Sequence, residues 1–155
     1  MKQFISIIAC AFFAIALCSC NPTKELEANA MDIQFTELQN YFVNNYIPSS
    51  KEQHLYINSQ QEFEQYFGQA TVMGANGQPT EVNFKKQFVV ALIRPETNRA
   101  TSIHTTAVKQ NGNAIILYYH ENKGDKGGYT VVPFTAVAID KPQEAQNFQF
   151  YFRKN

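Results

Sequence analysis

The chain has 155 residues, with 13 Lys and Arg against 13 Asp and Glu, and 45% of its residues are hydrophobic. This length fits one domain, and the apolar fraction is that of a globular protein, which excludes wholesale disorder. A neutral balance of charge provides no electrostatic attraction to nucleic acid, so a dedicated DNA- or RNA-binding protein is disfavoured.

The first twenty residues have the plan of a bacterial export signal. A basic start precedes an apolar run at residues 4–17, which is shorter than the roughly 20 residues of a membrane span. The run ends in Leu-Cys-Ser-Cys at residues 17–20, which resembles the lipobox of bacterial lipoproteins. The resemblance implies cleavage after residue 19, diacylglycerol on the Cys20 sulfur and an acyl chain such as palmitate on the new amino group. The alternative is an ordinary secretory signal cleaved nearby.

Processing at this position changes the cysteine chemistry of the protein. Cys10 and Cys18 leave with the signal peptide (residues 1–19), and Cys20 becomes a thioether. The processed chain then excludes a cysteine nucleophile, a cysteine-ligated zinc and a disulfide framework. We expect a lipidated tether at residues 20–31 and a single globular domain at residues 32–155. The expected location is the bacterial cell envelope, as an outer-membrane lipoprotein on either the periplasmic or the surface side.

Two short helices are predicted at the start of this domain. Thr36 to Gln39 fits a capping box, and apolar residues recur after it at helical spacing. A short strand is expected at residues 55–57. Ser59 to Glu62 is a second capping box, and Gly68 is a plausible stop for the helix that follows. The apolar positions that define the two helices are Phe35, Leu38, Phe42 and Tyr46 in the first, and Phe63, Tyr66 and Phe67 in the second.

The rest of the chain has β patterning. Residues 88–93 are apolar on both faces, which predicts a central strand buried on both sides. Asn111-Gly112 predicts a tight hairpin turn, and Pro133 predicts an edge or a bulge. A loop is expected at residues 71–81, and strands at residues 102–109, 114–120, 129–139 and 148–153, with Phe148, Phe150 and Phe152 on the buried face of the last. The fold class predicted is α+β and mostly β: an antiparallel β-sandwich or coiled sheet with two short N-terminal helices.

Three segments between residues 55 and 141 resemble a known family. They are INSQQEF at residues 57–63, VNFKKQFVVA at residues 82–91 and VPFTAVAIDK at residues 132–141. They are similar to the C-terminal domain of the PrcB family of protease-complex subunits. The resemblance implies a non-enzymatic β domain that associates with a protease. Residues 94–101 depart from the family, which usually has a Thr-Gly-Gly-Tyr turn at this point.

Two segments are candidates for recognition of a partner. Residues 94–101 and 121–128 are expected to be loops at the ends of the sheet, where a rigid scaffold displays binding residues. The second contains three glycines and two lysines, and the alternative is a turn that only adds solubility. The candidate binding residues are Thr97, Arg99, Lys123, Asp125 and Lys126.

No catalytic, metal or cofactor site is predicted. His104 and His120 could face each other across the hairpin, and Asp140 or Glu121 could complete a metal site. The preferred interpretation is a pair of half-exposed strand histidines. Ser59 fits a helix cap better than a nucleophile.

These observations lead to three hypotheses for function. The first is a non-catalytic, lipid-anchored envelope protein that binds another protein. The PrcB resemblance alone suggests a secreted or envelope protease as that partner, to be stabilised or inhibited. The second is a lipoprotein that binds a small ligand or a glycan. Exposed tyrosines along a groove would favour it, and the candidates are Tyr118, Tyr119, Tyr129 and Tyr151. The third, an enzyme, requires His104, His120 and Asp140 to cluster.

Overall fold

The computed structural model of the chain describes residues 26–71, 73–74, 77–142 and 147–155. The expected signal peptide and Cys20 lie outside these residues. A helical turn at residues 26–28 precedes the first strand. The elements that follow are β1 (Met31–Asp32), β2 (Thr36–Glu37), β3 (Tyr41–Val43), β4 (Gln53–Ile57), α2 (Gln60–Tyr66), β5 (Phe67–Gln69), β6 (Gln87–Ile93), β7 (Thr97–Asn111), β8 (Ala114–Val131), β9 (Phe134–Asp140) and β10 (Gln149–Lys154).

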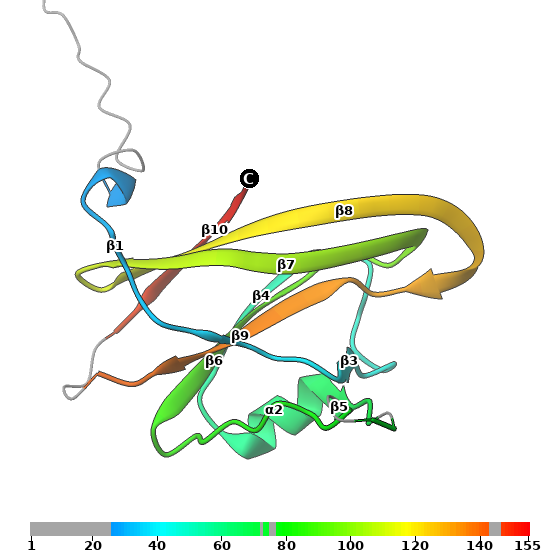
Figure 1. Cartoon of the computed structure of the whole chain (residues 1–155), viewed down its shortest axis with the longest axis horizontal. Coiled ribbons are helices and arrows are strands. Elements are labelled where there is room, and N and C mark those ends of the chain that lie inside the picture. The colour runs from blue at the N-terminus through cyan, green and yellow to red at the C-terminus, as the bar shows by residue number, and fades with distance from the viewer. Residues whose placement is uncertain (1–25, 72, 75–76, 143–146) are drawn as a thin grey trace, which may run out of the picture.

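The strands form a β-sandwich, which confirms the predicted fold class. The outer sheet has the strand order β1-β7-β8-β10, and the central sheet has the order β2-β9-β6-β4. The small pair β3–β5 and helix α2 lie on the side of the central sheet away from β7 and β8 (Figure 1). Neighbouring strands are antiparallel throughout, except that β10 pairs parallel to β8.

The core consists of two apolar clusters, one on each face of the central sheet. Strand β6 contributes alternate residues to both: Val89, Ala91 and Ile93 pack toward α2, and Phe88, Val90 and Leu92 pack toward the outer sheet. All six are at most 1% exposed. The prediction of a strand buried on both sides is confirmed. The expected inward face of the last strand is confirmed as well, because Phe148, Phe150 and Phe152 pack against the cluster between the sheets.

Helix α2 begins where the second capping box predicted. The Ser59 side chain accepts a hydrogen bond from the Glu62 backbone N–H at 3.2 Å. The Glu62 carboxylate accepts from the N–H of Asn58, one residue earlier than in a standard capping box. Phe63 is the buried residue of this short helix and anchors it to the central sheet.

The first predicted helix, over residues 36–46, is wrong. Thr36–Glu37 pairs with β9 as strand β2, and Tyr41–Val43 pairs with β5 as strand β3. Between them Asn40 has a φ of 61°, a left-handed conformation that asparagine tolerates and that ends any regular helix. The helical spacing of apolar residues therefore has another origin: Leu38 and Val43 are buried, while Phe42 and Tyr46 are exposed. Long-range strand pairing overrides the local pattern.

The predicted loop at residues 121–128 is also wrong, and residues 97–101 of the other expected loop are strand. Both segments belong to the long antiparallel ribbon of β7 and β8, which begins beyond the Asn111–Ala114 turn and continues to Thr97 and Val131. Gly124 makes this pairing possible, because a Cβ there would lie 2.9 Å from the Ala100 carbonyl oxygen. At least one of the glycines that suggested a flexible loop, Gly124, instead allows the close approach of the neighbouring strand.

The described part of the expected tether is attached to the outer sheet. Met31 pairs with Gln110, and the Asn111 side chain donates a hydrogen bond to the Leu26 carbonyl at 3.0 Å. The Glu27 carboxylate forms an ion pair with Arg153 at 2.6 Å. The folded part of the chain therefore begins before Asp32.

Candidate functional site

The distal ribbon, defined here as residues 97–101 of β7 and 123–131 of β8, contains all five residues predicted to bind a partner. Arg99 pairs with Lys126, and Lys123 pairs with Thr101. The register is irregular between Thr97 and Thr101, so the strands pair here with bulges. Bulges increase local twist and redirect side chains. The structure thus brings the predicted residues together on two strands instead of two loops.

Two hollows are lined by residues of β7 where the distal ribbon begins. The first, the basic hollow, has a volume of about 330 Å³. It is lined by Arg94, Pro95, Glu96, Thr97, Arg99, Thr101, Glu121 and Lys123. Three predicted residues, Thr97, Arg99 and Lys123, therefore line one concavity. Asp125 and Lys126 are exposed on the ribbon and are not among its lining residues.

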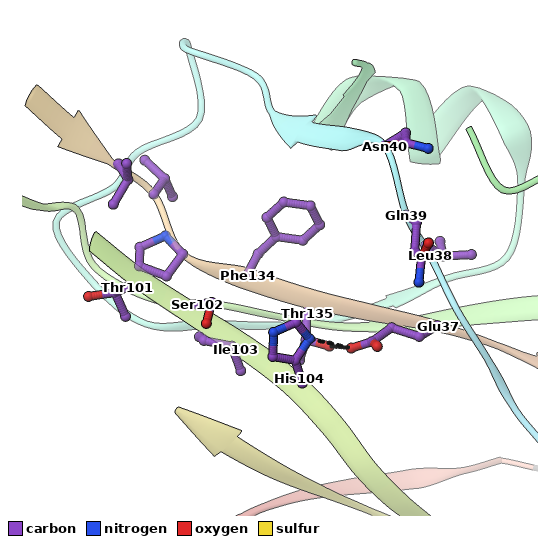
Figure 2. Close-up of a pocket in the computed structure, with 13 residues that line it drawn as sticks. Glu37, Leu38, Gln39, Asn40, Thr101, Ser102, Ile103, His104, Phe134 and Thr135 are labelled. Atoms are coloured by element: carbon purple, nitrogen blue, oxygen red, sulfur yellow. Dashed lines mark hydrogen bonds and ion pairs between the residues drawn. The ribbon is translucent and has the colours of Figure 1, made fainter. Parts of the chain in front are cut away.

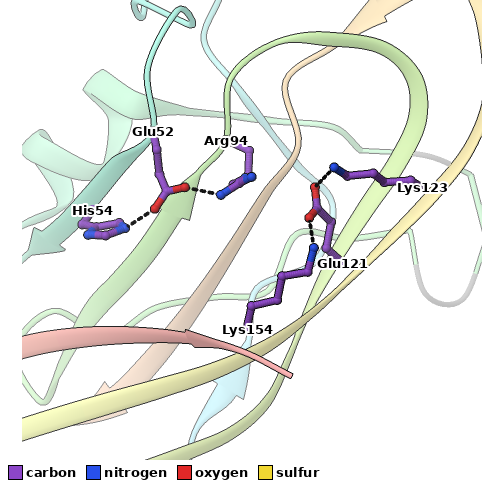
Figure 3. Close-up of polar contacts among 6 residues, drawn as sticks. All are labelled: Glu52, His54, Arg94, Glu121, Lys123 and Lys154. Atoms are coloured by element: carbon purple, nitrogen blue, oxygen red, sulfur yellow. Dashed lines mark hydrogen bonds and ion pairs between the residues drawn. The ribbon is translucent and has the colours of Figure 1, made fainter. Parts of the chain in front are cut away.

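Glu121 is the electrostatic centre of the basic hollow. Its side chain is only 4% exposed and forms ion pairs with Lys154 and with Lys123, the latter at 3.6 Å (Figure 3). Burial alone would raise the pKa of this carboxyl, but the Lys154 hydrogen bond and the charges of Lys123, Lys154 and Arg94 together lower it. The carboxylate is therefore ionised, and it holds Lys123 of the hollow's lining and Lys154 of β10.

A second ionic cluster neighbours the first. The Glu52 carboxylate pairs with Arg94 through one oxygen and with His54 Nε2 at 2.7 Å through the other (Figure 3). Arg99 donates a hydrogen bond to the Gly124 carbonyl across the ribbon at 3.2 Å. The cations around the basic hollow thus hold the β6–β7 connection and the ribbon in place.

The second hollow, the edge groove, has a volume of about 350 Å³ and lies between the edges of the two sheets (Figure 2). Its walls are residues 101–104 of β7 on one side and residues 37–40 and 131–135 on the other. Glu37 Oε1 accepts hydrogen bonds from the Thr105 N–H at 2.9 Å and the Thr135 hydroxyl at 3.1 Å. His104 Nδ1 lies 3.8 Å from the same oxygen.

Sequence reasoning missed the edge groove, because Glu37 falls in the helix predicted over residues 36–46. The available signal is Thr135, a polar residue in the otherwise apolar run of β9. Its hydroxyl is 2.9 Å from that of Thr105, and both residues are buried. Buried hydroxyls require partners, so Thr135 indicates a polar contact between the sheets.

The two histidines are opposite each other across the hairpin, and Asp140, one of the two carboxylates considered for a metal site with them, has another partner. His104 and His120 are opposite each other in the β7–β8 register. His120 Nε2 is 3.0 Å from Asn122 Oδ1, and Asp140 is bound to Gln87, which pairs with it in the central sheet. Within the described residues no group of three or more His, Cys, Asp or Glu side chains could hold a metal ion.

The tyrosines considered for a binding face are dispersed. Tyr119 is buried between the sheets, whereas Tyr118 alternates with it and faces outward. Burial and the nearby Glu27 carboxylate raise the pKa of Tyr118. Tyr129 is 51% exposed on the distal ribbon. No tyrosine lines the basic hollow or the edge groove.

Comparisons with protein-family models, curated proteins and solved structures gave no match to this chain. Among the residues that the structure describes, no helix is both long and apolar enough to span a membrane.

Proposed function

We propose that this protein is a non-catalytic, lipid-anchored protein of the bacterial cell envelope. It binds another protein through the distal ribbon. The observation that carries the proposal is the position of the ribbon relative to the N-terminal segment. Met31 pairs with β7 at Gln110, thirteen residues from Thr97. At about 3.3 Å per residue, this separation is about 40 Å.

The two ends of the ribbon therefore have different neighbours. A lipid on Cys20, six residues before Leu26, would hold the turn end of the ribbon near an outer membrane. Figure 1 shows β1 beside the turn end of the β7–β8 ribbon and the distal end on the opposite side, so the distal end would then face away from the lipid. It carries Arg99, Lys123 and Lys126 together with the exposed Tyr129, and tyrosine and arginine are residues that interfaces favour.

A protease is the proposed class of partner, which the protein would stabilise or inhibit. This part rests on the resemblance to the PrcB family. All three resembling segments contribute to the central sheet and its helix: residues 57–63 enter α2, residues 82–91 include the first five residues of β6, and residues 132–141 include β9. The resemblance therefore concerns the central sheet and its helix, while the proposed contact lies on the outer sheet.

A photo-crosslinking residue at Asp125 tests the proposal in intact cells. We expect a covalent adduct with one envelope protein, and the matched control is the same residue at Asn113, at the other end of the same ribbon. Labelling with a radioactive fatty acid and Cys20→Ala test the anchor, since the variant should lose the label and leave the membrane fraction. An adduct at Asn113 but none at Asp125 would contradict the proposed binding end.

A second candidate function is binding of a small ligand or glycan. The edge groove favours it, because its volume of about 350 Å³ falls in the range of ligand pockets. No tyrosine lines the edge groove, however, and exposed tyrosines along a groove were the feature expected of such a site.

A further inference from the structure

The edge of β7 is covered by the chain's own N-terminal segment over only part of its length. Strand β1 pairs antiparallel with Lys109 and Gln110, and the Ile33 N–H donates to the Val108 carbonyl at 2.9 Å. The chain then leaves the outer sheet and joins the central sheet as β2. Strand β7 continues for another eleven residues, 97–107, without a neighbouring strand on this side among the described residues.

A single side chain takes the place of the missing strand at the next position. The Thr105 N–H points to this edge, because it donates to Glu37 Oε1. Backbone groups alternate in direction along a strand, so the N–H and C=O groups of Ile103 and Thr101 point to the same edge. Within the described part of the chain no other strand pairs with them. Unpaired edge groups of this kind are a template for another chain.

These edge groups open into the edge groove. Thr101, Ser102 and Ile103 form its outer-sheet wall, and Gln39 and Phe134 stand on the opposite wall (Figure 2). Glu37 lies at one end of the groove, and its second oxygen, Oε2, has no hydrogen bond to any described residue. The groove thus combines backbone groups, an apolar wall and one carboxylate oxygen.

We propose that the edge groove binds an extended peptide segment of a partner protein, which adds to β7 as an antiparallel strand at Thr101 and Ile103. The segment continues the line of β1, so its N-terminal end lies beside Glu37. A basic side chain there would pair with Glu37 Oε2. This mode is β-strand addition, in which main-chain hydrogen bonds give affinity and side-chain pockets give specificity. The inference rests on the proposed function for the existence of a protein partner.

The shape of the groove favours a single extended chain over a second copy of the protein. The β7 edge is recessed between the two sheets, since residues 37–40 and 131–135 form the facing wall. Edge-to-edge pairing of two sandwiches would bring these walls into collision. A single strand needs only about 4.8 Å of lateral space beside β7.

The test uses the full-length protein in detergent and random seven-residue peptides displayed on phage. We expect selected peptides that carry Lys or Arg near the N-terminal end. In synthetic versions, N-methylation of alternate amides should weaken binding about tenfold or more, and methylation of the amides between them should not, because only alternate N–H groups face β7. Uniform sensitivity, uniform insensitivity or failure to select any peptide would overturn the inference.

Two pairs of variants locate the site. Gln39 is exposed on the groove wall, so Gln39→Trp should fill the groove and abolish binding of the selected peptide, while Gln39→Ala should retain it. Glu37→Gln keeps a hydrogen-bond acceptor for Thr105 and Thr135 but removes the charge. It should therefore weaken the binding of peptides with a basic residue at the N-terminal end and leave the binding of peptides with a neutral residue there unchanged. Unchanged binding by Gln39→Trp, or concentration-dependent dimers that the variant abolishes, would contradict the proposed occupant.

The crosslinking and peptide experiments together distinguish a failure of this inference from a failure of the proposed function. Crosslinking from Asp125 reports on the distal ribbon alone. If Asp125 still captures its partner while the groove binds no peptide, the inference fails and the proposed function stands. If peptides bind the groove in the alternating pattern but Asp125 and Asn113 capture nothing, the binding end of the proposed function is wrong and the groove remains a peptide site.

Discussion

The two long sides of the sandwich are closed in different ways. On one side, β4 of the central sheet and β10 of the outer sheet meet through aromatic rings: His54 stacks on Phe152 with centroids 4.1 Å apart, and Tyr56 stacks on Phe150 at 5.0 Å. On the other side, one carboxylate, that of Glu37, links β7 to β9. We call them the aromatic side and the polar side.

This difference gives the two sides different roles: the aromatic side stabilises the sandwich, and the polar side leaves space between the sheets for a ligand. Stacked rings bury apolar area between β4 and β10 and contribute to the core between the sheets. A carboxylate bridge satisfies polar groups but fills little space, so the polar side retains the edge groove. A sandwich of this kind can be held together at one side and remain open for binding at the other.

The largest effect is expected from breaking the aromatic side. Phe150 packs against Tyr56 and Phe88, so Phe150→Ala should lower the free energy of unfolding by about 3 kcal/mol, the lower end of the range for phenylalanine. Urea unfolding measures this, and the exposed neighbour Gln149 provides the control, since Gln149→Ala should cost little. Equal, small losses for the two variants would mean that the rings do not hold this side.

Removing the carboxylate of the polar side should lower the free energy of unfolding by less than Phe150→Ala does. Glu37→Ala leaves the Thr105 N–H and the Thr135 hydroxyl without their acceptor, which should lower the free energy of unfolding by about 1–3 kcal/mol. Glu37→Gln is the control, because an amide oxygen can still accept both hydrogen bonds. A loss from Glu37→Gln as large as that from Glu37→Ala would show that charge, and not hydrogen bonding, joins the sheets here.

A double-mutant cycle sharpens the account of the aromatic side. His54 and Phe152 stack near the exposed end of this side, so their coupling energy should be about 0.5–1.5 kcal/mol. The measurement compares the unfolding free energies of His54→Ala, Phe152→Ala and the double variant. A coupling energy of zero would place the stabilisation in Phe152 alone, through its packing on the core.

The smallest expected effect is a change in acid sensitivity where β8 meets β10. The pKa of Glu121 is lowered in the folded protein, so the ionised carboxylate stabilises the fold at any pH above its ordinary pKa of 4.5. This contribution is lost as the pH falls through the lowered value. The stability difference between the wild type and Glu121→Gln should therefore be constant near neutral pH and shrink on acidification.

Lys154→Met serves as the control for this effect, since Lys154 donates the hydrogen bond to Glu121. It should remove much of the acid-dependent difference, as measured by urea unfolding across a pH series. A stability difference that grows on acidification would mean that the pKa of Glu121 is raised instead.

Strands with a strong local pattern could be predicted from the sequence. The apolar run of β6 and the alternating phenylalanines of β10 each specify a strand and its buried face, and Ser59 specifies the start of α2. The distal ribbon could not be predicted, because its pairing depends on contacts such as that between Gly124 and Ala100, and a glycine- and lysine-rich segment is locally typical of a loop.

The candidate site was predictable only where it is exposed and charged. Thr97, Arg99 and Lys123 were identified as an irregular, charged surface, and they do line one hollow. Glu37 was not identified, since its partners Thr105 and Thr135 are 68 and 98 residues away in the chain. Periodicity reports on neighbours within a few residues and contains no information about such contacts.

That sequence separation also governs how the protein folds. The edge groove is assembled from residues 37–40, 101–104 and 131–135, and β2 pairs with β9 across about a hundred residues. Non-local pairing of this kind slows folding, because distant segments must meet before any contact is gained. A peptide in the groove recognises only the completed fold, so at a concentration of 100 Kd it would stabilise the protein by about 2.7 kcal/mol. Occupancy of the groove would therefore report that the chain has finished folding.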